Sequence, residues 1–394
     1  MHLKDEAPPP LESPVFGQPL HVGRPNIGDR AALMKRIEGI LDRLWFSNHG
    51  PLVQEFEQRV AQFLGVKHCV AMCNGTIALE IAIRACDLRG EVIVPSYTFV
   101  ATAHALQWLG LTPVFADIDL LTHNLAPDAV ERMVSPRTSG IIGVHLWGRP
   151  APIEELSQIA ERHRLQLLFD AAHAFGCSHR GRSIGNFGRC EVLSFHATKF
   201  FNTFEGGAVV TNDDELASRL RLMTNFGFAG YDNVVSAGTN GKMTEVCAAM
   251  GLTGLESIDE LIAINKRNYL AYREAFSELR GISLITHEEA EKCNYQYIVV
   301  EVSPTCPLNR DEIVNVLHER NVFARKYFWP GCHNMMPYRS LYPEAGLLLS
   351  NTNIVAERVV VFPTGRCVDQ TAITEIASII RTAALERRFT RTSP

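Results

Sequence analysis

Several patterns that identify common protein classes are missing from this sequence. The N-terminal stretch MHLKDEAPPP has acidic residues and prolines where a signal peptide needs an apolar core, and no apolar run is long enough to span a membrane. The ten cysteines include no C-x-x-C pair, and their spacing indicates no zinc site, so we assign no metal. These absences favour a reducing cytoplasmic setting over export.

Motifs of other enzyme classes are missing too. There is no G-x-G-x-x-G, so a nicotinamide dinucleotide is not expected, and no G-x-S-x-G supports a hydrolase triad of Asp170, His173 and Ser178. Gly241-Lys242 resembles the end of a P-loop, but the first glycine and the final Ser/Thr of that motif are replaced. The formal net charge of −5 gives no electrostatic footprint for nucleic acid or a membrane surface.

What is present indicates an ordinary globular protein with two cores. Apolar residues make up 46% of the chain and charged residues 21%. A chain of 394 residues is too long for one compact core. We expect a flexible leader over residues 1–14, a large domain over 15–250, and a smaller α+β domain over 251–394, where the pattern of apolar residues changes.

Short apolar runs alternate with helix-length stretches in the first two thirds of the chain. Several runs are apolar throughout, such as the segments 92–94 and 167–169, which is typical of strands covered on both faces. The sequence therefore predicts an α/β fold with a mainly parallel sheet between helices, and ligands at the carboxyl ends of its strands. The predicted strands of this sheet are residues 68–73, 91–94, 113–116, 140–145, 165–169 and 191–195.

The stretch SFHATKFFNTFEGGAVVTN contains a lysine in unusual surroundings. Lys199 lies between Phe195 and the pair Phe200-Phe201. Most lysines are solvated surface charges, but an apolar neighbourhood favours the neutral amine and lowers its pKa. A neutral amine is what carbonyl chemistry requires. This stretch by itself leaves both interpretations open.

Other polar residues follow predicted strands. Asp170 ends the run LQLLFD, where it either caps the next helix or holds a heterocyclic nitrogen protonated, as a pyridoxal phosphate (PLP) ring requires. Asn74-Gly75-Thr76 is a turn and helix start that could also bind phosphate, with Ser194 as a further donor. Phe99 either packs in the core or stacks on a flat cofactor.

These segments occur in an ordered series: NGT, PSYTFVAT, PVFADID, HLWGRP, LLFDAAHAFG, SFHATK, EGGAVVTND and GTNGKM. The series resembles the PLP-dependent nucleotide-sugar aminotransferases of the DegT–StrS family, within fold type I of the PLP-dependent transferases. The resemblance extends from about residue 25 to residue 388. The pair D-A-A-x-A-x-G and S-F-x-x-T-K is its most specific part.

The resemblance assigns roles to individual residues. Lys199 matches the lysine that forms a Schiff base with PLP, and Asp170 matches the carboxylate on the pyridine nitrogen. His173 stands where the family usually has glutamine, near the phenolic oxygen of the cofactor. Lys242 stands where arginine is common, and because lysine lacks the bidentate fork we assign it no carboxylate-binding role. The remaining positions carried over are Gly75, Thr76 and Ser194 for the phosphate, Phe99 for ring stacking, Asn240 for the phosphate in the neighbouring subunit, and His333 and Tyr338 for substrate.

The family also implies a reaction and an assembly. It implies a homodimer with shared active sites and an amino group moved from L-glutamate to a keto-sugar nucleotide. The segments HLWGRP and SFHATKFFNTFEGGA most resemble enzymes that aminate C4 of dTDP-4-keto-6-deoxyglucose. A 3-keto isomer, a keto-inositol acceptor and a non-catalytic PLP-binding regulator are the alternatives. PLP-dependent sugar dehydration is disfavoured, because relatives with that activity typically replace the lysine with histidine.

Overall fold

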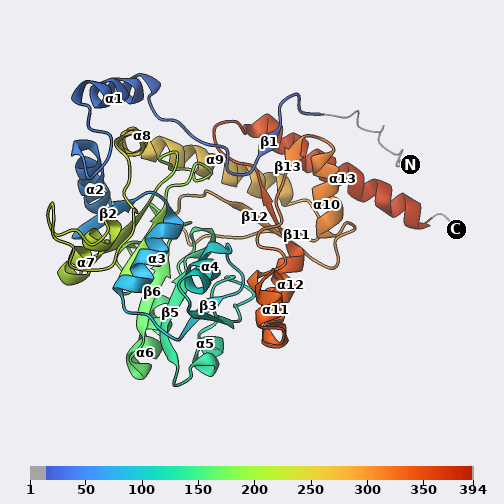
Figure 1. The fold of residues 1–394 in the computed structure, drawn as a ribbon. Helices are drawn as coiled ribbons and strands as arrows, with labels where there is room; N and C mark the ends of the chain where they lie inside the picture. Colours follow the sequence, from blue (N-terminus) through green and yellow to red (C-terminus); the bar gives the residue numbers. More distant parts are fainter. Residues whose placement is uncertain (1–14, 393–394) are drawn as a thin grey trace.

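The structure is a computed structural model that describes residues 15–392, so the expected leader at 1–14 lies outside the described residues. Its main feature is a seven-stranded sheet (Figure 1). In spatial order the strands are β2 (His68–Met72), β10 (Gly207–Thr211), β9 (Cys190–Ser194), β6 (Gln166–Asp170), β5 (Thr138–Val144), β3 (Glu91–Pro95) and β4 (Thr112–Ala116). All six strands predicted for this sheet are present, with ends that differ from the prediction by at most two residues.

The strand that the sequence did not predict is β10. It lies between β2 and β9 and is antiparallel to both, whereas the other neighbouring pairs in the sheet are parallel. The carboxyl ends of the other six strands therefore share one edge, and the amino end of β10 joins them there. At this edge Gly207 pairs with both Ser194 and Met72.

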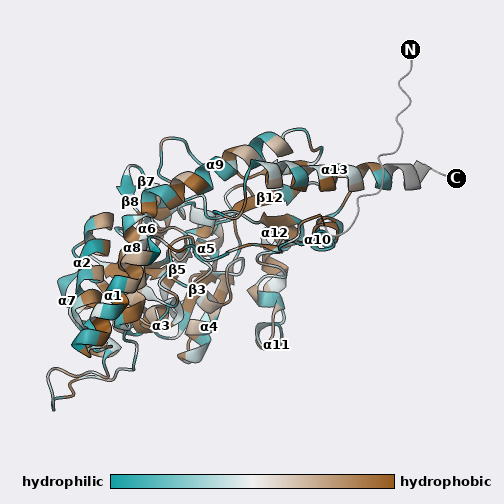
Figure 2. Ribbon diagram, turned by 90° about the horizontal axis from the view of Figure 1, so that it is seen from above, coloured by the Kyte–Doolittle hydropathy of each residue, from teal (hydrophilic) through white to brown (hydrophobic). Residues whose placement is uncertain are grey.

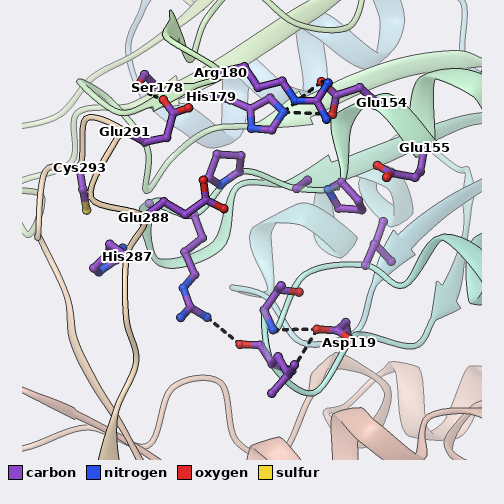
Figure 3. A pocket seen from close by; sticks show the side chains of 18 of the residues that line it. Asp119, Glu154, Glu155, Ser178, His179, Arg180, His287, Glu288, Glu291 and Cys293 are labelled. Carbon is purple, nitrogen blue, oxygen red and sulfur yellow. Dashed lines mark hydrogen bonds and ion pairs between the residues drawn. The ribbon is translucent and has the colours of Figure 1, made fainter.

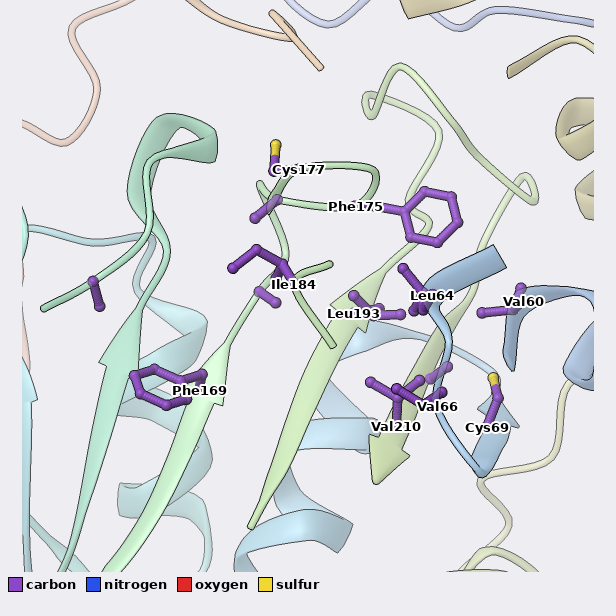
Figure 4. Close-up of a cluster of buried hydrophobic side chains, with 14 of the residues drawn as sticks. Val60, Leu64, Val66, Cys69, Phe169, Phe175, Cys177, Ile184, Leu193 and Val210 are labelled. Carbon is purple, nitrogen blue, oxygen red and sulfur yellow. The ribbon is translucent and has the colours of Figure 1, made fainter. Parts of the chain in front are cut away.

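Helices cover both faces of the sheet because successive strand residues point to opposite sides. Phe169 and Val210 pack in one core cluster with α2 (Pro51–Leu64), α5 (Pro127–Met133), α6 (Ile153–His163) and α8 (Glu245–Glu256), part of which Figure 4 shows. Leu168 and Val209 pack in another with α3 (Gly75–Ala85), α4 (Ala101–Trp108) and α7 (Asp214–Thr224). The expected α/β sandwich is thus observed.

The first described helix packs against α8 rather than the sheet. This helix, α1 (Arg30–Arg43), begins after Asp29, whose carboxylate accepts hydrogen bonds from the N–H groups of Ala31 and Ala32. The α8 helix ends at Glu256, and α9 (Ile258–Phe276) begins after Ser257. The two helices are thus separated by a single residue.

The C-terminal part has its own sheet and core. Strands β11 (Ile282–Leu284), β12 (Ile298–Val302) and β14 (Val359–Phe362) form an antiparallel sheet, against which α9, α10 (Arg310–His318) and α13 (Gln370–Thr392) pack (Figure 1). Strand β1 (Leu20–His21) pairs with β13 (Val322–Phe323), so the N-terminal segment also contributes to this core. The division of the chain at residues 250 and 251 stays a prediction.

Shorter elements complete the chain. They are β7 (Ser178–His179), β8 (Arg182–Ser183), η1 (Leu146–Gly148), η2 (Cys332–Asn334), α11 (Tyr338–Leu341), η3 (Ala345–Leu348) and α12 (Ser350–Arg358). Hydrophilic and hydrophobic residues both occur along helices such as α1, α2 and α9 (Figure 2). Among the described residues, no helix combines the length and the apolar character that crossing a bilayer requires.

Candidate active site

Asp170 is the last residue of the central strand β6 and is held in place by two hydrogen bonds. The Thr102 hydroxyl donates to Oδ2 at 2.9 Å, and the Ala172 N–H donates to Oδ1 at 3.1 Å. Thr102 is buried at the start of α4, so the carboxylate has a fixed orientation at the sheet edge. A half-buried carboxylate in this position can meet a cationic ring nitrogen.

Lys199 follows β9 and is half-buried beside the same edge. Its Nζ atom donates a hydrogen bond to the Tyr297 hydroxyl at 3.2 Å. Burial lowers the pKa of Lys199 to about 8, and the nearby Asp170 carboxylate and Tyr327 oppose that shift. The amine is therefore partly neutral near physiological pH.

The loop that carries Lys199 is anchored on both sides. Phe195, Phe200 and Phe201 are 0%, 5% and 1% exposed, and they point into the core rather than toward the amine. The Asn26 amide donates to the Phe200 carbonyl at 3.0 Å, and the Phe200 N–H donates to Gln296 Oε1 at 3.1 Å. Asn26 of the N-terminal segment and Gln296 of the C-terminal part thus fix the position of the loop that carries Lys199.

His173 is buried and held in one tautomer. The backbone N–H of Trp147 points at His173 Nδ1 at 3.4 Å. Nδ1 is therefore the acceptor nitrogen, and the ring proton is carried by Nε2. The imidazole lies against the rings of Trp147, Tyr297 and Phe328, with centroids 5.8, 4.6 and 5.8 Å away. Burial and the charge of Lys199 hold the pKa of His173 well below its usual value. The residue is therefore a neutral hydrogen-bond donor.

A potential anion site lies where β2 leads into α3. The Asn74 side chain caps α3 by accepting a hydrogen bond from Ile77 N–H, and Gly75 is the first helical residue. A Cβ atom on Gly75 would lie 3.0 Å from Ser194 Cβ, so only glycine allows the helix start to approach this serine without displacement. Thr76 is exposed beside them. Free N–H groups and hydroxyls in this arrangement suit a phosphate.

The other predicted cofactor-binding residues lie on the surface. Phe99 follows β3 and is 57% exposed, and its ring centroid lies 6.4 Å from that of Phe328 in an edge-to-face arrangement. The ring therefore has a face free for stacking. Asn240 is exposed in the segment that follows α7, where its backbone forms an isolated antiparallel β-bridge with Asn225. Its predicted role in a neighbouring subunit stays a prediction.

His333 and Tyr338, predicted to face the substrate, are both buried in the structure. His333 is 3% exposed, and its two ring nitrogens bond to Ser96 Oγ at 2.7 Å and Asn353 Oδ1 at 3.0 Å. Tyr338 is fully buried, and its hydroxyl bonds to His104 Nδ1 at 2.6 Å. The polar atoms of both side chains thus have partners within the protein, and the role of the two residues in substrate binding stays a prediction.

Three further aromatic residues belong to the site. Tyr297 contacts Lys199, Tyr327 lies close enough to influence its charge, and Trp147 positions His173. The Tyr97 hydroxyl in turn donates to the Tyr327 carbonyl at 2.6 Å. Trp147 is part of the segment HLWGRP, but nothing in the local sequence around Tyr297 or Tyr327 indicates their proximity to Lys199, which lies 98 and 128 residues earlier in the sequence.

A model of the DegT/DnrJ/EryC1/StrS aminotransferase family matches residues 28–381. The chain belongs to this family. The family resemblance, the expected aminotransferase activity and the α/β fold are therefore confirmed.

Named relatives of this aminotransferase match over nearly their full length. A Shigella dysenteriae protein named dTDP-4-amino-4,6-dideoxy-D-glucose transaminase is 37% identical over 94% of this chain and 99% of its own length. An Escherichia coli protein of the same name is 34% identical over 91% and 97%. The crystal structure of DesI, determined in the presence of its TDP-sugar product, is 48% identical over 96% of both chains, with a TM-score of 0.90.

The residues at this edge fit PLP in three respects. A half-buried amine with a lowered pKa can condense with the cofactor aldehyde, and a fixed carboxylate can face the pyridine nitrogen. The third is the close approach of Gly75 to Ser194, where a Cβ atom would fill the space beside the helix start. The amine, the carboxylate and the helix start would meet separate chemical groups of the cofactor. All three lie at the same edge of the large sheet.

Proposed function

We propose that this aminotransferase uses PLP to move an amino group from L-glutamate to C4 of dTDP-4-keto-6-deoxyglucose. The observation that carries the proposal is the grouping of Lys199, Asp170 and a neutral His173 at one sheet edge. The choice of sugar rests on the names of the two bacterial relatives, which specify a 4-amino-4,6-dideoxy sugar on dTDP.

When bound, PLP supplies an aldehyde that condenses with amines and a ring that accepts an electron pair. Lys199 would hold this aldehyde and, once released, would remove the proton from the α-carbon of the amino donor. Its lowered pKa provides the neutral amine that both tasks need at about pH 8. Tyr297, which accepts a hydrogen bond from Nζ, orients the amine.

Asp170 and His173 would fix the cofactor ring from two sides. The Asp170 carboxylate, oriented by Thr102, would keep the pyridine nitrogen protonated. The Nε2–H group of His173 would donate to the phenolic oxygen, a role compatible with glutamine because both side chains offer an N–H donor. Gly75, Thr76 and Ser194 would bind the phosphate, and Phe99 would stack on the ring.

Visible spectroscopy of the two half-reactions tests the proposal. We expect a yellow protein whose visible band bleaches with L-glutamate and returns with dTDP-4-keto-6-deoxyglucose. A GDP-linked 4-keto sugar, a 3-keto isomer and a keto-inositol should restore the band more slowly. Lys199→Ala should lose the band and turnover. A band that does not respond to glutamate, or full transamination by Lys199→Ala, would contradict the proposal.

We also propose a homodimer, supported by the exposed apolar residues of two adjacent segments. The N–H of Glu245, the first residue of α8, donates to the carbonyl of Phe46, and Asn48 and His49 line a pocket together with Asn225, so the turn after α1 lies beside the segment that follows α7. We call the large apolar side chains of these segments the apolar patch. Its members are Leu44, Trp45, Phe46, Phe226, Phe228, Tyr231, Val234 and Val235, all at least 37% exposed. A surface of this kind is typical of an interface between subunits.

A further inference from the structure

The side chain of Trp147 is fully buried beside the predicted catalytic residues and carries one hydrogen-bond donor. Its ring lies nearly flat against those of Phe328 and His173, with centroids 5.2 and 5.8 Å away and interplanar angles of 10° and 24°. The indole N–H cannot reach water from this position, so it needs an acceptor within the protein. That acceptor is Nδ1 of His123, which lies 3.2 Å from the indole nitrogen.

His123 is also fully buried, and its two ring nitrogens have separate partners. Because the indole nitrogen can only donate, Nδ1 of His123 is an acceptor and Nε2 carries the ring proton. Nε2 donates a hydrogen bond to Oε1 of Glu301 at 2.9 Å. The His123 side chain is 0% exposed, whereas that of Glu301 is 34% exposed, so the carboxylate keeps contact with solvent. We call Glu301, His123 and Trp147 the Glu–His–Trp triad.

The triad continues to His173 through the backbone of Trp147. Because the N–H of Trp147 occupies Nδ1 of His173, the Nε2–H group remains as the donor of that ring. Trp147 has a φ of 61°, a conformation that residues other than glycine adopt rarely, so its surroundings must hold the turn. The hydrogen bond from the indole to His123 holds the side chain of this residue in place.

The backbone of the same turn is held by the residue next to His123. Asn124 is 2% exposed, and its side-chain oxygen accepts a hydrogen bond from the N–H of Leu146 at 3.1 Å. Its amide donates to the carbonyl of Pro150 at 2.8 Å. The loop after β4 therefore contacts the turn through two neighbouring side chains. One is bonded to the ring of Trp147, and the other is bonded to the backbone on either side of it.

The loop after β4 is itself held where it borders a pocket of about 820 Å³. Asp119 accepts hydrogen bonds from the N–H groups of Leu121 and Thr122 at 3.0 and 2.8 Å (Figure 3). The guanidinium of Arg149, which follows the turn, donates to the carbonyl of Leu121 at 2.7 Å. The loop and the turn are thus joined on the side of the pocket as well.

Strand β12 connects the triad with the reactive lysine. Tyr297, which accepts the hydrogen bond from Lys199, directly precedes β12, and Glu301 lies four residues later. Side chains at this spacing on a strand point to the same face, and Val299 between them packs in the same core cluster as Tyr297. One face of the C-terminal sheet therefore meets both the amine and the triad.

We propose that the Glu–His–Trp triad positions His173 for the proposed reaction. Glu301 fixes the tautomer of His123, and His123 holds the indole of Trp147. The Trp147 turn then directs the Nε2–H donor of His173 at the phenolic oxygen of the cofactor. This inference rests on the proposed role of His173 toward PLP. Glu301 and His123 are positioning residues, because they act on the cofactor only through other side chains.

NMR spectroscopy of the cofactor-free, full-length protein tests the structural part of the proposal. The chain has four tryptophans, which gives a simple spectrum when tryptophan alone is isotope-labelled. The indole N–H signal of Trp147 is assigned by its loss in Trp147→Phe. We expect this proton to exchange with solvent about 100-fold more slowly than that of Trp108, which is 80% exposed. Equal exchange at the two indoles would overturn the proposal.

Substitutions of His123 distinguish a hydrogen-bond acceptor from a packing group. His123→Leu removes the acceptor at similar size and should speed exchange of the Trp147 indole proton about tenfold. His123→Asn offers a carbonyl oxygen close to the position of Nδ1 and should retain most of the protection. The matched control is Tyr272→Phe, because it also removes a buried hydrogen bond, from the Tyr272 hydroxyl to the Pro363 carbonyl, but in the C-terminal core. Unchanged exchange in His123→Leu, or the same acceleration in Tyr272→Phe, would contradict the role of His123.

Kinetics and visible spectra of the PLP-loaded enzyme test the link to His173. Because the donor to the phenolic oxygen is displaced, His123→Leu should shift the visible band. It should lower turnover about tenfold, with the KM for the sugar nucleotide within about twofold. His123→Asn should restore both properties, and Tyr272→Phe should change neither. An unaltered band and turnover in His123→Leu, or an equal loss in Tyr272→Phe, would overturn the proposal. The exchange measurement uses neither cofactor nor substrate, so failure of the triad and failure of the proposed reaction give different results.

Discussion

At the scale of single residues, the site depends on groups kept in uncommon charge states. Lys199 is partly neutral because burial disfavours its cation more than the Asp170 carboxylate favours it. His173 is neutral because it is buried beside that same cation. Neither state requires a bound cofactor. The polypeptide alone therefore prepares an amine nucleophile and a neutral donor at the sheet edge.

The state of Lys199 predicts a pH-dependent reactivity. With a pKa of about 8, half of its amines are neutral at pH 8, compared with about 0.3% for a lysine with the ordinary value. Because the neutral form reacts, labelling of the cofactor-free protein with acetic anhydride should rise with pH and reach half of its maximal rate near pH 8. Mass spectrometry measures this rate, with the exposed Lys67 as internal reference. A half-point near pH 10.5 would contradict the prediction.

Local sequence was informative where chemistry and chain neighbours coincide. Lys199 among phenylalanines and Asp170 at the end of an apolar run were both identified in this way, and the fold places both at the predicted edge. Tyr297 and Tyr327 could not be identified from their local sequence, because they reach Lys199 only through the packing of the C-terminal part. The local sequence also did not reveal the partners of His333, whose ring nitrogens form hydrogen bonds with Ser96 and Asn353.

At the scale of elements, the antiparallel strand β10 completes the predicted phosphate site. Its five residues are buried, and their apolar pattern does not reveal that the strand lies between β2 and β9. That placement brings Gly207 against the start of α3. A Cβ atom on Gly207 would lie 2.6 Å from both the Asn74 carbonyl carbon and the Gly75 nitrogen. The strand therefore fixes the distance between the sheet and the helix N-terminus.

Gly207→Ala should displace the start of α3. The added methyl group meets backbone, which cannot rotate away, so we expect about 1–3 kcal/mol of destabilisation and at least tenfold weaker PLP binding. Gly17→Ala is the matched control, because a Cβ atom there would meet nothing within 4 Å. Fluorescence titration with PLP and thermal unfolding measure the two effects. An unchanged PLP affinity in Gly207→Ala would show that this contact does not shape the phosphate site.

At the scale of the whole molecule, the large sheet and the C-terminal part both contribute residues to the candidate active site. The sheet edge carries Asp170, His173 and Lys199, and the C-terminal part supplies Tyr297 and Tyr327. The N-terminal segment pairs with the C-terminal part through β1 and contacts the lysine loop through Asn26. The apolar patch and the exposed Asn240 extend this dependence to a second subunit in the proposed homodimer.

Mixing two inactive subunits tests whether Asn240 acts across the dimer. We expect Lys199→Ala to be inactive and Asn240→Ala to lose at least tenfold in activity, because a phosphate contact is removed. In a mixed dimer, the site with an intact Lys199 would receive its Asn240 from the other subunit. If the residue serves the neighbouring site, co-expression should restore about a quarter of the wild-type activity, since half of the randomly formed dimers are mixed and each has one complete site. If Asn240 serves its own subunit, mixing should restore nothing. Light scattering must show dimers in both cases, and Tyr231→Asp in the apolar patch should shift them toward monomers.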